Sequence, residues 1–339
     1  MKVFKLNPLV GLAILAGLST HIMGQAQTAS ACKNTPEVSD ITVMADWLPW
    51  ASQGPMVAAQ LKGFYKDEGL NVTLMAPANP ADPIRLVAAQ RVTFSLTYVP
   101  EVMMAREQGI PVVSIGTTLR VLSSGLFFKG EKAIRSAADL KGMTLGVGPK
   151  QDAQAFLATV LEGGGLTRSD VKVVDPGFAH KEMIMTDRID AAHGLTYGEG
   201  VATSDQLVSE GKQAARWLMY TDFGVPKIYY QLLVGNEEWV KRNSAATCRF
   251  LRATRKGLDV WRDSPADTVA QIAKLNTQFT LAQHQKMQQM TAMHWYAANG
   301  EVFQQDEANW TQARDWALKR QLITKSVPAS SYFTNAYVK

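Results

Sequence analysis

The sequence predicts an α/β protein of two lobes, each a mainly parallel sheet flanked by helices. The chain has 339 residues, enough for two globular units with cores of their own. Short apolar strands alternate with helical segments from residue 41 to residue 234, as βαβ units do. Beyond residue 237 the pattern is helical. We therefore expect lobe 1 over residues 40–120 and 235–339, lobe 2 over residues 121–234, and a C-terminal helical segment packed on lobe 1.

The first 31 residues have the pattern of a secretory signal peptide. Lys2 and Lys5 precede an apolar run over residues 9–18, and Ala29-Ser30-Ala31 offers a cleavage site. The run is shorter than the roughly 20 apolar residues that cross a bilayer as a helix. We therefore predict that residues 1–31 are removed and that the mature protein is exported and soluble.

Composition argues against several classes of function. The chain is 46% hydrophobic and 19% charged, and its formal net charge of +5 includes both lysines of the signal peptide. Lysine and arginine are scattered and form no basic run interleaved with aromatic residues, so we predict no nucleic-acid partner. The sequence lacks the GxSxG, Walker and HExxH motifs, and its histidines are dispersed. We expect neither an enzyme, nor a metal, nor a cofactor.

Two cysteines, Cys32 and Cys248, leave three interpretations open. Cys32 follows Ala31 directly, so it could carry a lipid anchor, although the leucine usual in a lipobox is missing. The two cysteines could instead form a disulfide in an oxidising compartment. We favour a buried thiol for Cys248, since it lies in an amphipathic helical segment.

An aromatic loop follows the first predicted strand, which covers residues 41–45. The loop contains Trp47 and Trp50, and Pro55 opens a helix that closes near Gly69. Open α/β sheets bind ligands at the carboxyl ends of their strands. We therefore predict that the two tryptophans stack on a flat heteroaromatic ligand, with burial in the core as the alternative.

Further candidates stand at the ends of later strands. Tyr98 ends a strand, and its hydroxyl can donate or accept a hydrogen bond. Glu199 lies in the glycine-rich loop over residues 194–200, which also contains Tyr197. A carboxylate there could accept two hydrogen bonds from an aminopyrimidine edge, or it could be a solvated charge at a helix start.

Two other positions are ambiguous in the sequence. Tyr229 and Tyr230 are neighbours on a predicted strand, so only one of them can face a cleft. His193 sits at a strand end, where we interpret it as hydrogen-bonded structure rather than as a ligand contact.

Asp46-Trp47-x-Pro49, the helix end over residues 62–70, and Leu86-Val87-Ala88-Ala89 resemble periplasmic solute-binding proteins of ABC importers, in the family that shares its fold with the yeast thiamin-pyrimidine synthase. Four segments are most similar, within that family, to binders of the thiamin pyrimidine precursors hydroxymethylpyrimidine and formylaminopyrimidine. They are Asp46-Trp47-Leu48-Pro49, Leu96-Thr97-Tyr98-Val99-Pro100, Phe223-Gly224-Val225-Pro226 followed by Tyr229-Tyr230, and Phe333-Thr334-Asn335. The resemblance implies a two-lobed type II periplasmic binding protein, monomeric, that delivers its ligand to ABC permease and ATPase subunits.

We predict that eight residues contact the ligand: Trp47, Trp50, Gln53, Tyr98, Ser123, Tyr197, Glu199 and Tyr229. Two of them depart from the family pattern, which usually has a polar residue at the position of Trp50 and often histidine at that of Gln53. A second stacking tryptophan would suit a wider ring system, such as a flavin.

Two further alternatives stay open. In a sulfonate or taurine binder, Ser123, Ser124 and the helix start at Gln151 would grip the anion. A synthase of the same fold is the other alternative, against which stand the signal peptide and the absence of the synthase's cysteine-rich motif.

Overall fold

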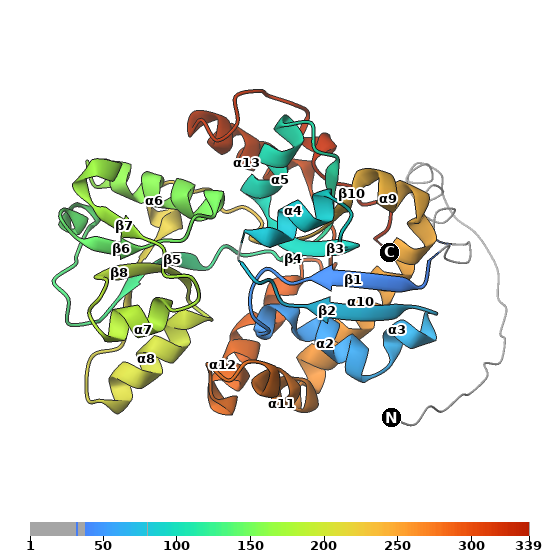
Figure 1. The fold of residues 1–339 in the computed structure, drawn as a ribbon, viewed down its shortest axis with the longest axis horizontal. Coiled ribbons are helices and arrows are strands. Elements are labelled where there is room, and N and C mark those ends of the chain that lie inside the picture. Colours follow the sequence, from blue (N-terminus) through green and yellow to red (C-terminus); the bar gives the residue numbers. More distant parts are fainter. Residues whose placement is uncertain (1–31, 33–37, 80, 339) are drawn as a thin grey trace.

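The computed structural model describes residue 32, residues 38–79 and residues 81–338, so the predicted signal peptide lies outside the described residues. Two lobes lie side by side and are joined through the middle of the molecule (Figure 1). None of the helices in these ranges is both long and apolar enough to cross a membrane.

Lobe 1 is built on a five-stranded sheet in the order β2-β1-β3-β10-β4. The strands are β1 (Asp40–Met44), β2 (Asn71–Met75), β3 (Phe94–Tyr98), β4 (Val112–Leu119) and β10 (Gln231–Asn236). β1 pairs in parallel with β2 and β3, whereas β10 runs antiparallel to β3 and β4. All strands but β10 therefore run in one direction.

Lobe 2 repeats this plan with the order β7-β6-β8-β5-β9. The strands are β5 (Ser124–Phe128), β6 (Thr144–Gly146), β7 (Lys172–Val174), β8 (Ala191–Leu195) and β9 (Arg216–Met219). β6 pairs in parallel with β7 and β8, and β5 runs antiparallel to β8 and β9. In each lobe the strand that runs the other way is the first one after a crossing.

The chain crosses between the lobes twice, through residues 120–123 and residues 224–230. Because β10 pairs with lobe 1 from Gln231 onward, the chain has already returned before the predicted boundary at residue 234. That boundary is wrong by a few residues, since strand periodicity does not reveal which sheet a strand joins.

Helices cover both sheets (Figure 1). Lobe 1 has α2 (Gly54–Leu61), α3 (Phe64–Asp67), α4 (Asp82–Ala88) and α5 (Val99–Glu107), and lobe 2 has α6 (Gln151–Gly163), α7 (His180–Met185) and α8 (Glu199–Ser209). The single helix predicted between Pro55 and Gly69 is divided into α2 and α3. The division falls at Gly63, whose φ of 78° is a left-handed conformation that suits glycine.

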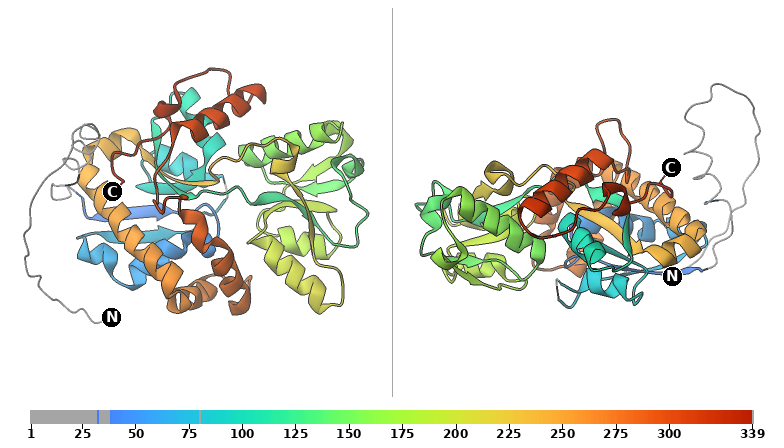
Figure 2. Two further views of the ribbon diagram at one scale, coloured as in Figure 1. Left: turned by 180° about the vertical axis from the view of Figure 1, so that it is seen from behind. Right: turned by 90° about the horizontal axis from the view of Figure 1, so that it is seen from above.

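The C-terminal segment packs on lobe 1 as predicted, and it also reaches lobe 2 (Figure 2). Its helices are α9 (Glu237–Arg242), α10 (Ser244–Asp263), α11 (Ala266–Leu275), α12 (Leu281–Thr291) and α13 (Glu307–Lys319). α10 packs along α2. From α12, Lys286 pairs with Asp205 of α8 at 2.9 Å, and from α13 the Trp316 ring lies 5.6 Å from that of Phe156 in α6.

Cys32 and Cys248 form a disulfide, with their Cα atoms 5.5 Å apart across a sequence separation of 216 residues. The favoured interpretation of Cys248 as a free buried thiol is therefore wrong, because Cys32 is itself buried against α10. A lipid anchor on Cys32 would be attached through the same Sγ atom, so the disulfide and the anchor exclude each other.

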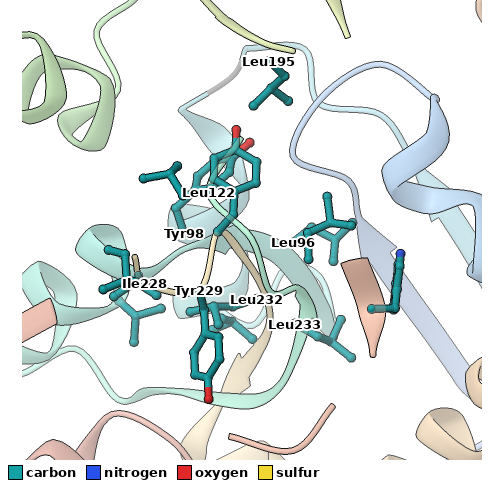
Figure 3. Packing of buried hydrophobic residues seen from close by; sticks show 14 of the residues in the cluster. Leu96, Tyr98, Leu122, Leu195, Ile228, Tyr229, Leu232 and Leu233 are labelled. Atoms are coloured by element: carbon teal, nitrogen blue, oxygen red, sulfur yellow. The ribbon is translucent and has the colours of Figure 1, made fainter. Parts of the chain in front are cut away.

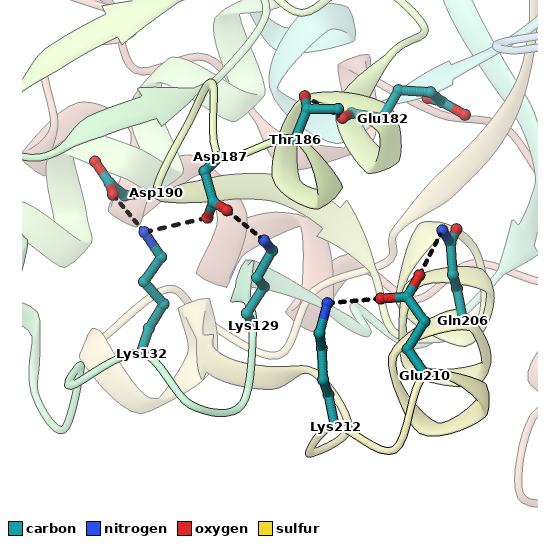
Figure 4. A network of polar contacts seen from close by, with 9 residues as sticks. All are labelled: Lys129, Lys132, Glu182, Thr186, Asp187, Asp190, Gln206, Glu210 and Lys212. Carbon is teal, nitrogen blue, oxygen red and sulfur yellow. Dashed lines mark hydrogen bonds and ion pairs between the residues drawn. The ribbon is translucent and has the colours of Figure 1, made fainter.

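A group of charged side chains on lobe 2 forms ion pairs with one another (Figure 4). Lys129 contacts Asp187 at 2.6 Å, and Lys132 contacts Asp190 at 2.7 Å. None of these four side chains lines the cleft between the lobes. These ion pairs stabilise lobe 2, and their side chains do not contact a ligand in the cleft.

Candidate ligand-binding site

A cleft of about 230 Å³ lies between the lobes, where the carboxyl ends of strands from both sheets meet. Lobe 1 contributes the loop after β1 and the end of β3, and lobe 2 contributes the segments after β6, β7 and β8. The aromatic and titratable side chains that line it are Trp47, Trp50, Tyr98 and Tyr230 from the lobe-1 side, and Lys150, Asp152, Phe178, His180, His193 and Glu199 from lobe 2.

A chain of hydrogen bonds fixes the loop after β1. The buried Asp46 accepts the Tyr98 hydroxyl on Oδ2 at 2.6 Å and the Nε2 of Gln53 on Oδ1 at 2.8 Å. The Oε1 of Gln53 in turn accepts the backbone N–H of Trp50 at 2.8 Å. Burial, together with the nearby charge of Asp46, raises the pKa of Tyr98 well above its usual value. The hydroxyl therefore stays protonated and remains a donor.

Aromatic rings from the two lobes meet at the cleft. The half-buried Trp47 of lobe 1 meets Phe178 of lobe 2 edge-on, at a centroid distance of 4.5 Å and an angle of 70°. Lys150 of lobe 2 places its Nζ 4.3 Å from the centre of the Tyr98 ring and 5.9 Å from that of Trp47. Such walls suit a flat ligand, because aromatic faces offer apolar area and accept cations on their π-electrons.

Trp50 differs from Trp47 in its burial. Only 2% of Trp50 is exposed, and its ring lies 6.5 Å from that of Trp47 and 6.2 Å from that of Tyr197 in lobe 2. Its Nε1 is buried and has no hydrogen-bond partner among the described residues. Trp50 therefore belongs to the floor of the cleft and touches both lobes.

Glu199 is the first residue of α8 and is 8% exposed. Its Oε2 accepts the backbone N–H of Leu195 at a long 3.3 Å. Burial raises the pKa of Glu199 from 4.5 to about 7, because the charged form is poorly solvated there. Near neutral pH this carboxyl can therefore donate one hydrogen bond and accept another.

Two other titratable groups of lobe 2, Asp152 and His180, are buried at the cleft, and a third, His193, is half-buried there. Burial raises the pKa of Asp152, against the attraction of Lys150, and lowers the pKa of His180 to about 4. The Oδ1 of Asp152 and the Nδ1 of His180 have no hydrogen-bond partner among the described residues. Burial also lowers the pKa of His193 to about 3, and its Nδ1 lies 2.8 Å from the hydroxyl of Tyr220, as expected for a structural histidine.

Four of the eight predicted contact residues line the cleft: Trp47, Trp50, Tyr98 and Glu199. Gln53 and Tyr197 lie one layer behind it. Gln53 bonds Asp46, and the Tyr197 ring lies between those of Trp50 and His294.

Ser123 and Tyr229 lie in the crossing segments and do not line the cleft. The Tyr229 hydroxyl donates to Asp306, and its ring points away from Tyr98 (Figure 3). Tyr230 faces the cleft instead, with its ring 4.9 Å from that of Tyr98. As expected, only one of the two tyrosines faces the cleft, and it is Tyr230.

Sequence reasoning missed Lys150, Asp152, Phe178 and His180 as lining residues. All four come from segments that follow β6 and β7, so the strand-end rule that selected Trp47 applies to them equally. Within the described ranges, no group of three or more histidine, cysteine, aspartate or glutamate side chains is placed to hold a metal ion.

Residues 50–268 match the family described as NMT1/THI5 like. The chain belongs to this family. Among the relatives of this NMT1/THI5-like protein, a formylaminopyrimidine-binding protein of Halalkalibacterium halodurans is 28% identical over 99% of both chains. The riboflavin-binding protein RibY of Chloroflexus aurantiacus is 26% identical over 92% of this chain and 90% of its own. A 4-amino-5-hydroxymethyl-2-methylpyrimidine phosphate synthase of Saccharomyces cerevisiae is 27% identical over 65% of this chain and 66% of its own.

Solved structures share the fold of this NMT1/THI5-like protein. The periplasmic aliphatic sulphonate binding protein SsuA of Escherichia coli matches it with a TM-score of 0.62 and 14% identity, over 87% of this chain and 92% of that one. The predicted two-lobed periplasmic-binding-protein fold is therefore confirmed, and so is the family resemblance.

Proposed function

We propose that this NMT1/THI5-like protein is the extracytoplasmic substrate-binding component of an ABC importer and that it binds a thiamin pyrimidine precursor between its lobes. The observation that carries the proposal is Glu199, a buried carboxyl with a pKa of about 7 in a cleft with aromatic walls. The full-length similarity to a formylaminopyrimidine-binding protein supports it.

The chemistry of Glu199 matches that of an aminopyrimidine edge. A 4-aminopyrimidine presents an N–H donor beside a ring-nitrogen acceptor. A protonated carboxyl accepts from the amino group with one oxygen and donates to the ring nitrogen with the other. Trp47 and Phe178 would cover the ring, and Asp152 would accept from a polar substituent.

The energy required for such binding is within reach of a small ligand. A molecule of about ten non-hydrogen atoms has an efficiency ceiling near −15 kcal/mol, whereas micromolar to nanomolar affinity corresponds to about −8 to −12 kcal/mol. Enclosure between two lobes and a few well-placed polar contacts are sufficient.

The sulfonate alternative has less support from the geometry. Ser123 does not line the cleft, and the Oγ of Ser124 already donates to the carbonyl of Gly194 at 2.9 Å. The two hydroxyls expected to grip an anion are therefore not directed at one. The flavin alternative has a family relative in its favour, and it depends on whether Trp50 leaves room for a fused ring system.

Absence of catalysis is part of the proposal. The formylaminopyrimidine-binding protein is 28% identical over 99% of the chain, whereas the synthase relatives are 27% identical over 65% of it and 24% identical over 88% of it. We expect the purified protein to release its pyrimidine unchanged after repeated cycles of binding and dilution. Turnover of a pyrimidine or pyridoxal compound would contradict this part of the proposal.

Calorimetry on the purified mature protein tests the ligand. The panel contains formylaminopyrimidine, hydroxymethylpyrimidine, thiamin, riboflavin and an alkanesulfonate. We expect sub-micromolar binding of a pyrimidine precursor and a matching rise in melting temperature, since a thousandfold excess over Kd stabilises the native state by about 4 kcal/mol. Binding of the sulfonate or riboflavin alone would overturn the proposal.

A further inference from the structure

We infer that Trp50 sets the size of the ring system that the cleft accepts, admitting a single ring and excluding a fused one. This inference rests on the proposed function, because it concerns which heterocycle the same cleft binds. It assigns Trp50 a role different from the stacking that the sequence predicted.

The position of Trp50 is fixed at its base. Its backbone N–H is bonded to Gln53, which is itself bonded to the buried Asp46. Only 2% of the residue is exposed, whereas Trp47 on the same loop is half-buried. The indole therefore has little freedom to swing aside when a ligand enters.

Lobe 2 holds the other end of the ring. A Cβ atom added to Gly198 would lie 2.4 Å from Cζ3 of Trp50 and 3.0 Å from Cη2, so the indole packs directly on the backbone of that glycine. The rings of Trp47 and Tyr197 stand at 6.5 Å and 6.2 Å. Trp50 thus fills the space between the lobes and presents no free face on which a second ring could stack.

The consequence concerns the length of the ligand. Trp50 lines the cleft of about 230 Å³ and is packed against Trp47, Tyr197 and Gly198, so a single ring in contact with Trp47 and Glu199 leaves the indole in place. A flavin carries three fused rings and would need the volume that Trp50 occupies. A smaller residue at this position would join that volume to the cleft, as cavity-forming substitutions do in cores.

The chain contains a matched control for this contact. Gly200 packs on Trp217 in the same way, since a Cβ there would lie 2.2 Å from Cζ2 of that ring. Both residues belong to lobe 2, and Trp217 packs on Phe127 outside the cleft. Gly200 adjoins Glu199, so only Trp217 serves as the control: its substitution alters tryptophan packing in lobe 2 at a side chain that does not line the cleft.

The experiment compares W50A and W217A for two probes, formylaminopyrimidine by calorimetry and riboflavin by fluorescence quenching. We expect W50A to bind riboflavin at least about tenfold more tightly than the natural protein and the pyrimidine at least about tenfold more weakly, the scale of a lost or gained pocket contact. W217A is expected to keep both affinities. W50F, which retains an aromatic ring, should fall between the natural protein and W50A.

A double-mutant cycle tests the contact itself. G198A should weaken pyrimidine binding, because its methyl group pushes against the indole, and W50A/G198A should bind as W50A alone does. Additive losses would show that the two residues act separately, and this would overturn the inference.

The outcomes separate the inference from the proposed function. If the natural protein binds the pyrimidine and a folded W50A or W50F gains no riboflavin affinity, the size inference fails alone. If the natural protein binds no pyrimidine but W50A gains riboflavin, the proposed function fails and the size inference stands. If the natural protein binds riboflavin as tightly as W50A does, Trp50 does not select for size.

Discussion

On the lobe-1 side of the cleft, the acidic and amide side chains are bonded to one another, whereas on the lobe-2 side two buried titratable side chains that line the cleft each leave one atom unpaired. Asp46 accepts from Tyr98 and Gln53, and of the buried side-chain atoms on this loop only the Nε1 of Trp50 and the Oγ of Ser52 lack a partner among the described residues. Across the cleft, within the described residues, Asp152 and His180 each leave one atom unpaired.

This difference indicates that the two lobes contribute to binding in different ways. A closed hydrogen-bond chain holds the aromatic loop in place before any ligand arrives, which lowers the ordering cost of binding. Unpaired buried groups are unfavourable in the free protein and are satisfied when a complementary ligand enters. We infer that lobe 1 shapes the site and that lobe 2 recognises the polar edge of the ligand.

The largest effect is expected on ligand affinity, from a substitution of Glu199 in lobe 2. E199A removes the carboxyl that would pair with an aminopyrimidine edge, and two hydrogen bonds of this kind correspond to about 100-fold in Kd. Calorimetry with formylaminopyrimidine measures the loss.

E210A is the control for E199A. Glu210 lies just beyond the other end of α8, where it pairs with Lys212 at the surface (Figure 4). Its removal should leave the affinity unchanged. Equal affinities for E199A and E210A would mean that lobe 2 does not recognise the ligand through Glu199.

The next largest effect is expected from a substitution in lobe 1, and it concerns the free energy of unfolding. In D46N one of the two acceptors becomes an amide donor that faces another donor, at a cost of about 2–3 kcal/mol in the free energy of unfolding. Urea unfolding measures it. D40N, at the exposed start of β1 where Asp40 bonds Asn71, should stay within about 0.5 kcal/mol of the natural protein. If both variants unfold alike, the lobe-1 wall is not preorganised by Asp46.

A smaller effect is expected from Y98F, which removes one donor to Asp46 and leaves the ring under Lys150. We expect a loss of about 1.5 kcal/mol in stability. The pyrimidine Kd should stay within about threefold, because the hydroxyl is already committed to Asp46.

Y65F provides the comparison for Y98F, since the buried Tyr65 hydroxyl bonds Thr254 at 2.8 Å outside the cleft. Both variants should lose stability while both keep their affinity. A large loss of affinity in Y98F alone would mean that the Tyr98 hydroxyl bonds the ligand directly. Lobe 1 would then also recognise the polar groups of the ligand.

The two sheets and the lobe-1 wall of the site could be predicted from the sequence. Strand periodicity and the strand-end rule selected Trp47 and Tyr98, because these residues follow clear apolar strands. The same rule applies to Phe178 and Asp152, but a single sequence does not indicate which side chain of a loop turns inward.

Other features depend on tertiary arrangement. Alternation along a strand predicted that one of Tyr229 and Tyr230 faces the cleft, but the path of the crossing segment decides which. The disulfide joins residues that are distant in sequence, and it requires Cys32 to lie beside α10, which no local pattern encodes. The role of Trp50 likewise depends on the backbone of Gly198 in the other lobe.

The smallest effect is a pH dependence that tests whether the Glu199 carboxyl of the recognising wall is neutral. Its pKa is raised from 4.5 to about 7 by burial, so the folded protein holds a proton that the unfolded chain has released. The stabilisation linked to this proton is complete below about pH 4.5 and is lost as the pH rises through about 7. E199Q does not titrate at this position. Between pH 6 and pH 8 the natural protein should therefore lose about 1 kcal/mol of unfolding free energy relative to E199Q.

Urea unfolding of both proteins across this range gives the difference directly. Glu101, whose pKa burial also raises to about 7, acts in the same direction, whereas His180 and His193, with lowered pKa values, favour folding as the pH rises toward 6.5. These groups are present in both proteins, so their contributions cancel in the difference. A difference that stays constant from pH 6 to pH 8 would mean that Glu199 is ionised throughout. The carboxylate would then only accept hydrogen bonds, so an aminopyrimidine would have to bind with its ring nitrogen protonated.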